Sequence, residues 1–182
     1  MKYLTKPRFF SSLLTRCAGT LLALIFSSAA LANPYKITVL ATNISDYGGL
    51  GEWSFSAFFE GEKDSVLFDT GFKSDTVLHN VQHLGVDLSN TEKVVLSHFH
   101  SDHTGGLLVL RDYFGKINPK ALSEVYIARG FFDQRLTREG EQVGPGLFAS
   151  ATAFKTEAEK RGIRLIEADG PTEIAPALRR AG

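Results

Sequence analysis

The sequence has 182 residues, and its 20 Lys and Arg balance 20 Asp and Glu, so the formal net charge is zero. This balance leaves no basic excess for a nucleic-acid-binding surface, which excludes that class of function. The one cysteine excludes an intrachain disulfide, and the length suits a single domain with one hydrophobic core.

Residues 1–32 have the pattern of a secretory signal peptide. They contain four basic and no acidic side chains, an apolar run from Ala18 to Phe26, and the small-x-small sequence Ala30-Leu31-Ala32. An uncleaved membrane anchor is the alternative, but the run is shorter than the roughly 20 residues of a transmembrane helix. We expect cleavage after Ala32, no stable membrane anchor afterwards, and a periplasmic or secreted location. Cleavage would remove four of the 20 basic residues and leave a formal charge of −4.

Residues 33–182 are predicted to form the folded domain, in which short apolar runs alternate with amphipathic segments. Three strands are expected first, arranged as a meander: Ile37–Leu40, Phe55–Phe59 and Val66–Phe68. The polar, glycine-rich stretch Thr42–Gly51 would connect the first two strands. Asp69 ends the third strand and is followed by Thr70-Gly71.

An amphipathic helix is predicted over Ser74–Leu84. Ser74 is the expected N-cap, and Gly85 stands where a C-terminal glycine belongs. The predicted apolar face consists of Val77, Leu78, Val81 and Leu84.

Two histidines of this helix, His79 and His83, lie four residues apart, a spacing that can chelate a metal ion. However, Asn80 stands where a zinc-protease helix has glutamate. We therefore interpret both histidines as structural or solvent-facing.

The stretch from Val94 to Gly106 carries the strongest chemical signal. Its apolar start, Val94–Leu96, predicts a buried strand, and Gly105-Gly106 is expected to let the chain turn tightly into the next helix. Four potential metal ligands lie between them, within six residues: His98, His100, Asp102 and His103. A lone histidine would be weak support, but three imidazoles and a carboxylate on one strand-to-helix loop predict a metal site.

The remaining sequence continues the alternation that is typical of an α/β layered domain. The expected elements are a helix from Leu107 to Phe114, a strand over Val125–Ala128, a helix over Ala149–Arg161 and a strand over Ile163–Ile166. Gly130–Gly146 is a long irregular stretch that carries Phe131, Phe132, Arg135 and Arg138. We expect it either to contact substrate or to be an ordinary surface loop.

The cluster His98-x-His100-x-Asp102-His103 resembles the signature of the metallo-β-lactamase fold superfamily, and Leu67-Phe68-Asp69-Thr70-Gly71 is similar to its first motif. Three further segments resemble a branch that includes dihydropterin-type synthases of methanopterin biosynthesis and many exported hydrolases: Glu52-Trp53-Ser54-Phe55-Ser56, His79-Asn80 and Leu84-Gly85. The resemblance extends from about Lys36 to Pro176. It implies an α/β (α+β layered) fold, the first half of an αββα sandwich, with a mixed sheet and flanking helices.

The resemblance also implies roles for individual residues. His98 and His100 would belong to a first metal position, Asp102 and His103 to a second, and Asp102 would orient the nucleophile as the catalytic residue. Asp69 would support the metal loop by hydrogen bonds from outside the ligand set, with turn capping as the alternative. The cofactor would be Zn²⁺, as one or two ions, with other divalent metals as alternatives.

The expected function is a metal-dependent hydrolase with a small-molecule substrate. The ion would lower the pKa of a bound water and hold the hydroxide against a polarised carbonyl or phosphoester. Lactam, phosphodiester, thioester and lactone substrates are all open. The alternative is a non-catalytic exported remnant that binds a metal or a partner. Synthase-type chemistry ranks third, because a signal peptide fits poorly with a cytoplasmic pterin pathway.

The later ligands of the superfamily have no counterpart in this sequence. All five histidines lie between His79 and His103, and the later aspartates, Asp112, Asp133 and Asp169, stand in no ligand motif. The superfamily takes a further His, a bridging Asp and a final His from the second half of its fold. We therefore expect a chain truncated near Ala177, with activity in doubt. A natural half that associates through its unpaired sheet face, giving an oligomer, is the alternative.

Overall fold

The computed structural model describes residues 35–133, 138–140, 150–175 and 178–179. The predicted signal peptide and Arg135 lie outside these residues.

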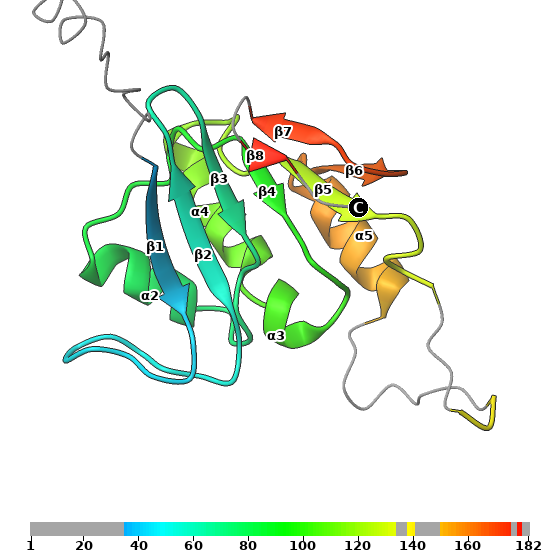
Figure 1. The fold of residues 1–182 in the computed structure, drawn as a ribbon, viewed down its shortest axis with the longest axis horizontal. Helices are drawn as coiled ribbons and strands as arrows, with labels where there is room; N and C mark the ends of the chain where they lie inside the picture. Colours follow the sequence, from blue (N-terminus) through cyan, green and yellow to red (C-terminus); the bar gives the residue numbers. More distant parts are fainter. Residues whose placement is uncertain (1–34, 134–137, 141–149, 176–177, 180–182) are drawn as a thin grey trace, which may run out of the picture. The chain divides into compact units, whose positions relative to one another are not determined.

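A six-stranded mixed sheet, in the order β1-β2-β3-β4-β5-β6, is the centre of the fold (Figure 1). Its strands are β1 (Lys36–Ala41), β2 (Ser56–Glu60), β3 (Ser65–Phe68), β4 (Lys93–Val95), β5 (Glu124–Ala128) and β6 (Arg164–Ala168). The first three pair antiparallel as the predicted meander. The last three extend the sheet in parallel. Parallel neighbours need a crossover connection, which places a helix between successive strands.

Three helices cover one face of the sheet and enclose the main core (Figure 1). The helices of the described chain are α2 (Thr76–His83), α3 (Ser101–Thr104), α4 (Leu107–Ile117) and α5 (Ala151–Lys160), of which α3 is a single short turn. Leu67 and Val94 from the sheet, Val77 from α2 and Leu110 from α4 are fully buried in this core. Phe154 adds α5 to the same cluster. The predicted fold class, a mixed sheet with flanking helices, is confirmed.

The predicted N-cap of α2 is wrong by one residue. The helix begins at Thr76, and Asp75 is its N-cap in place of Ser74, without a side-chain capping hydrogen bond. Leu84, predicted on the apolar face, is 42% exposed. Gly85 has a φ of 64°, the left-handed conformation expected of a C-terminal glycine.

The opposite face of the sheet contacts a strand pair that the sequence does not predict, β7 (Glu173–Ala175) with β8 (Leu178–Arg179). Ile174 and Ala175 pack there on Val66 and Val95 in a second, smaller cluster. The face is covered only in part, because Ile37 and Val39 of edge strand β1 are 59% and 50% exposed.

Arg111 of α4 is a buried cation that donates to main-chain carbonyls. It is 9% exposed, and its guanidinium donates to the carbonyls of Arg161 at 3.0 Å, Pro119 at 2.9 Å and Ala121. These bonds tie α4 to the loop before β5 and to the end of α5.

We expect Arg111→Ala to lower the free energy of unfolding by about 3 kcal/mol, because buried carbonyls lose their donors. Urea denaturation measures this loss. The control is Arg129→Ala: Arg129 is exposed and pairs with Asp169 at 2.8 Å, and removal of an exposed pair costs about 1 kcal/mol or less. Equal losses in the two variants would contradict the structural role of Arg111.

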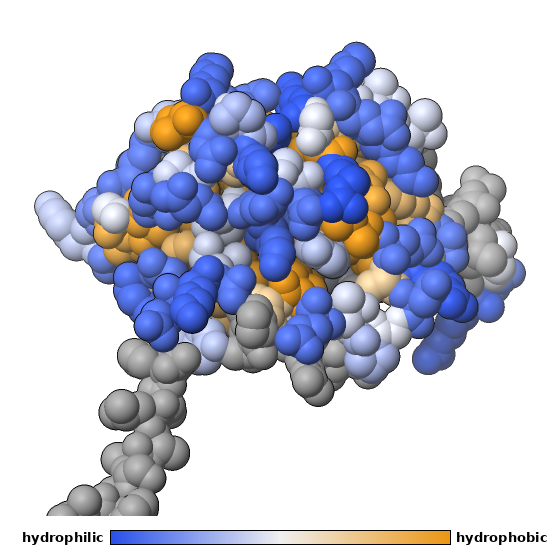
Figure 2. Space-filling model, turned by 90° about the horizontal axis from the view of Figure 1, so that it is seen from above, coloured by the Kyte–Doolittle hydropathy of each residue, from blue (hydrophilic) through white to orange (hydrophobic). Residues whose placement is uncertain are grey.

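No helix among the described residues combines the length and hydrophobicity that a bilayer crossing requires. Viewed from the end of the sheet opposite α3, the surface is mainly hydrophilic, with hydrophobic residues showing between the polar ones (Figure 2).

Candidate metal centre

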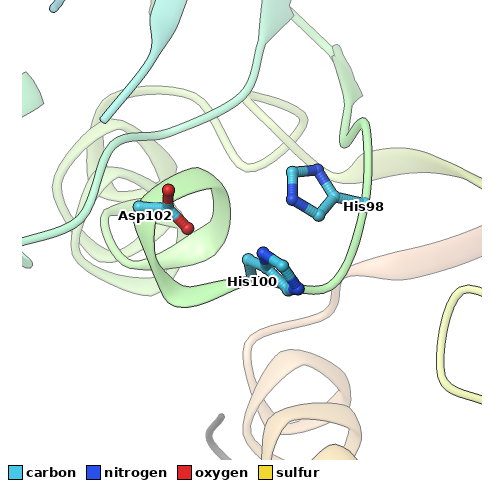
Figure 3. A group of neighbouring side chains, drawn as sticks. All are labelled: His98, His100 and Asp102. Atoms are coloured by element: carbon cyan, nitrogen blue, oxygen red, sulfur yellow. The ribbon is translucent and has the colours of Figure 1, made fainter. Parts of the chain in front are cut away.

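Three of the four predicted ligands converge at the end of β4 (Figure 3). His98 and His100 lie on the loop that leaves the strand, and Asp102 lies in the first turn of α3. The turn is closed by hydrogen bonds to the His100 carbonyl, from His103 N–H at 3.1 Å and from Thr104 Oγ1 at 2.9 Å. This closure brings Asp102 round to face the two imidazoles.

The spacing of these three side chains fits a metal ion. One ligand atom from each of His98, His100 and Asp102 lies within 4.8 Å of the others. Ligand atoms around a tetrahedral zinc lie roughly 3.4 Å apart, as bond lengths near 2.1 Å require. Small side-chain rotations would bring the three atoms to that spacing. Two imidazoles and a carboxylate are also ligand types that zinc accepts.

His103 lies beside this group and is held by Asp69. Its Nδ1 is 2.6 Å from Asp69 Oδ2, and its Nε2 lies 3.5 Å from Asp102 Oδ2. A carboxylate accepts hydrogen bonds, so this contact favours the tautomer with the proton on Nδ1 and leaves the Nε2 lone pair toward Asp102. The predicted division of the ligands between two metal positions stays a prediction.

Asp69 also reaches His98, through Ser97. Its carboxylate accepts from Ser97 N–H and from Ser97 Oγ, both at 2.8 Å. Ser97 Oγ lies in turn 3.0 Å from His98 Nδ1. A hydroxyl that donates to Asp69 accepts from His98 Nδ1–H, which leaves Nε2 of His98 available to a metal. Asp69 itself is 1% exposed and has a φ of 52°, a left-handed conformation that aspartate tolerates better than most residues. Its contribution to metal binding stays a prediction.

The pKa of His98 is lowered. Burial is the main cause, and the neighbouring imidazoles of His103 and His100 act in the same direction. The His98 ring lies 4.2 Å from each of these rings, centroid to centroid. Because neutral imidazole is the form that binds metals, these surroundings favour ligation.

The α3 turn rests on the main chain that follows Asp69. Thr70 donates to the His103 carbonyl from its N–H at 2.7 Å and from its Oγ1 at 3.0 Å. In return, Gly105 N–H donates to Gly71 O at 2.9 Å and Gly106 N–H to Thr70 O at 3.1 Å. The position of Asp102 and His103 therefore depends on the segment after β3.

Gly105-Gly106 form the predicted tight turn from α3 into α4, but this turn does not need the backbone freedom of glycine. Gly105 has a φ of −63° and Gly106 a φ of −84°, which any residue adopts. The structure requires glycine there for space: an added Cβ would lie 1.8 Å from Phe72 O at Gly105 and 2.3 Å from Thr70 O at Gly106.

The helical histidines lie outside this site, as interpreted from the sequence. His79 Nε2 is 3.0 Å from Gly48 O, and His83 Nε2 is 3.5 Å from Asp46 Oδ1. Both side chains therefore attach α2 to the loop between β1 and β2.

The stretch after β5 contributes to the core in its described part. Phe131 is 4% exposed, and its ring centroid lies 5.6 Å from that of Phe99 on the metal loop. Phe132 packs on Phe99 as well, at 5.0 Å. Arg138 is exposed. The expectation of substrate contacts in this stretch stays untested.

Two residues that organise the site carry no role in the sequence-based prediction. Ser97 has no local signal beyond its position next to His98. Glu52 belongs to a segment of the resemblance, but nothing in the sequence shows what its carboxylate binds.

Comparison with known proteins points to one superfamily. Residues 54–175 match the model of a family described as the metallo-beta-lactamase superfamily. A curated relative from Methanocaldococcus jannaschii, a 7,8-dihydropterin-6-methyl-4-(beta-D-ribofuranosyl)-aminobenzene-5'-phosphate synthase, is 27% identical over 118 residues. The match covers 65% of this chain and 38% of the relative.

Solved structures are also similar to this chain, and two of them serve as examples. Tm1679, described as a metal-dependent hydrolase of the beta-lactamase superfamily, matches with a TM-score of 0.55 and 27% identity, over 80% of this chain and 47% of that one. The metallo-beta-lactamase fold protein YhfI from Bacillus subtilis matches with a TM-score of 0.50 and 21% identity, over 79% and 51% of the two chains. The chain thus spans about half the length of these solved structures and less of the curated relative.

Proposed function

Because this chain belongs to the metallo-beta-lactamase superfamily, we propose that it is a zinc-dependent hydrolase that acts on a small-molecule substrate. The observation that carries the proposal is the convergence of His98, His100 and Asp102 within 4.8 Å, beside an imidazole that Asp69 holds. The activity of the whole protein is part of the proposal, since the chain spans less than half the length of the curated relative.

The side chains of the site divide into ligands and supports. His98, His100 and Asp102 would hold one ion, and His103 with Asp102 would offer the predicted second position. Bound zinc would supply Lewis acidity and an activated water. Asp69 contacts His103 Nδ1 directly and His98 Nδ1 through Ser97, and thereby favours, in the neutral rings, the tautomers that carry the proton on Nδ1. Asp102, whose carboxylate is half-buried beside the imidazoles, would accept a hydrogen bond from the attacking water and orient it.

A second candidate is the chemistry of the curated relative, which is named as a synthase. At 27% identity over 38% of that protein, the match supports a shared fold more than a shared reaction. A non-catalytic metal-binding role is the third candidate. Zinc uptake without turnover on any substrate would favour it over hydrolysis.

The test is hydrolysis of small lactones, esters, thioesters, lactams and phosphodiesters by the zinc-loaded protein. Against any substrate that is turned over, Asp102→Ala is expected to lower kcat/KM by at least about 100-fold, because the water loses its orienting carboxylate. Asp112→Ala is the control. Asp112 lies on α4 and pairs with Arg161 at 2.9 Å, outside the site. Full activity in Asp102→Ala, with the control unchanged, would refute the role of Asp102.

A further inference from the structure

Glu52 is an enclosed carboxylate that joins two loops. It is 9% exposed. Oε1 accepts from Ser54 Oγ at 2.8 Å and from Phe72 N–H at 2.7 Å, and Oε2 accepts from Lys73 N–H at 3.1 Å and from Thr76 Oγ1 at 2.8 Å. Burial raises the pKa of Glu52, but these hydrogen bonds, led by that of Phe72, outweigh it and the pKa is lowered. The carboxylate therefore favours its charged form inside a cage of neutral donors.

The first loop that Glu52 contacts supports the α3 turn through main-chain contacts. Its bonds to the amides of Phe72 and Lys73 fix the chain directly after Gly71. Gly71 O accepts from Gly105 N–H, and Phe72 O lies so close to Gly105 that a Cβ would meet it at 1.8 Å. A shift of the Phe72 carbonyl would therefore move the end of α3.

The second loop also contacts the α3 turn. Phe55 N–H donates to the carbonyl of Asp102 at 3.4 Å, and Phe55 O accepts from Gly71 N–H at 3.1 Å. Ser54, which donates to Glu52, directly precedes Phe55. The second loop thus contacts the main chain of Asp102, and the first loop contacts the main chain at the end of α3.

We propose that Glu52 is a positioning residue of the metal centre: its carboxylate locks the loops before β2 and before α2 together and thereby sets the place of the Asp102 turn. The four hydrogen bonds of Glu52 described above go to none of the four predicted ligands, so its effect on them runs through the main chain of Phe55 and residues 70–73. The inference rests on the proposed function, because it assumes that the site binds a metal.

The chain offers a matched control in Asn80. Asn80 is 5% exposed, and its amide ties the same β1–β2 loop to α2 through bonds to Leu50 N–H at 2.8 Å, Leu50 O at 2.8 Å and Leu40 O at 2.7 Å. It thus resembles Glu52 in burial and makes three side-chain hydrogen bonds against the four of Glu52, and none of these three goes to α3. Asn80→Ala measures what loosening the loop does by itself.

The experiment compares wild type, Glu52→Gln and Asn80→Ala for zinc affinity by chelator competition, and for the visible d–d spectrum of the Co²⁺-loaded protein. Glutamine keeps the size of the side chain, but its N–H₂ group would face the main-chain N–H of Phe72 or of Lys73. Two donors cannot form a hydrogen bond, so one of these bonds is lost. We expect zinc affinity to fall about tenfold in Glu52→Gln, with an altered Co²⁺ spectrum, as for other residues that support ligands. Asn80→Ala is expected to lose thermal stability while its affinity and spectrum stay those of wild type.

Thr76→Val is a milder variant in case Glu52→Gln does not fold. It removes one donor to Oε2 and keeps a β-branched side chain, and a smaller loss of affinity in the same direction is expected. Wild-type affinity and spectrum in the Glu52 or Thr76 variant, or equal changes in Asn80→Ala, would overturn this inference alone. A wild-type protein that binds neither ion would overturn the proposed function and this inference with it.

Discussion

Replacement of Gly105 by alanine is expected to lower the free energy of unfolding by at least about 3 kcal/mol and to abolish zinc binding. The added Cβ would lie 1.8 Å from Phe72 O and 2.9 Å from Ser101 O, and main-chain atoms cannot rotate away. At a φ of −63° alanine is otherwise acceptable, so the backbone conformation itself does not require glycine. Any loss therefore comes from the clash, which must displace α3 and the ligand Asp102.

Urea denaturation and zinc titration of the Gly105→Ala protein measure both effects. Gly170→Ala is the control, since a Cβ at Gly170 meets no atom within 4 Å among the described residues. This control should match wild type in stability and in zinc affinity. Wild-type zinc affinity in Gly105→Ala would show that α3 is not held by its close approach to Phe72.

Asp69→Asn is expected to weaken zinc binding by about 10-fold to 100-fold while the fold persists. Asparagine has the size of aspartate, so Ser97 N–H keeps an acceptor. With its oxygen toward Ser97 N–H, the new N–H₂ group would take the place of Oδ2 and face both Ser97 Oγ and His103 Nδ1, from which Asp69 now accepts at 2.8 Å and 2.6 Å. A donor at His103 Nδ1 would move the ring proton to Nε2, and a protonated Nε2 cannot bind a metal.

Zinc competition measures the effect of Asp69→Asn, and Asp87→Asn is a matched control. Asp87 accepts from Ser89 N–H at 2.8 Å and from Ser89 Oγ at 2.9 Å, the same pair of contacts that Asp69 makes with Ser97. Equal zinc affinity in Asp69→Asn and Asp87→Asn would show that Asp69 serves the loop conformation and not the imidazoles.

The sequence by itself determined the order of the six strands of the main sheet and of the three longer helices between them, and the position of the ligand cluster. Both are local properties: alternating apolar runs specify strands and helices over a few residues, and His98 to His103 lie within one loop. The mixed sheet with flanking helices was implied by the resemblance to the superfamily, and the alternation of strands and helices agrees with it, because parallel strands need a crossover connection. The same local signals misplaced the N-cap of α2, which is Asp75 instead of Ser74. The chain just before it is held by Glu52 of the β1–β2 loop, which accepts from the amides of Phe72 and Lys73.

Only the tertiary structure decided what supports the ligands. The contact of Asp69 with His103 joins residues 34 positions apart, and that of Glu52 with Phe72 joins residues 20 apart. Such hydrogen bonds form when strands pair and loops meet at one end of the sheet, and they leave no periodic pattern in the sequence. Gly105 shows the same division. Its identity is visible in the sequence, but the reason for it is a carbonyl oxygen from another segment that leaves no room for a side chain.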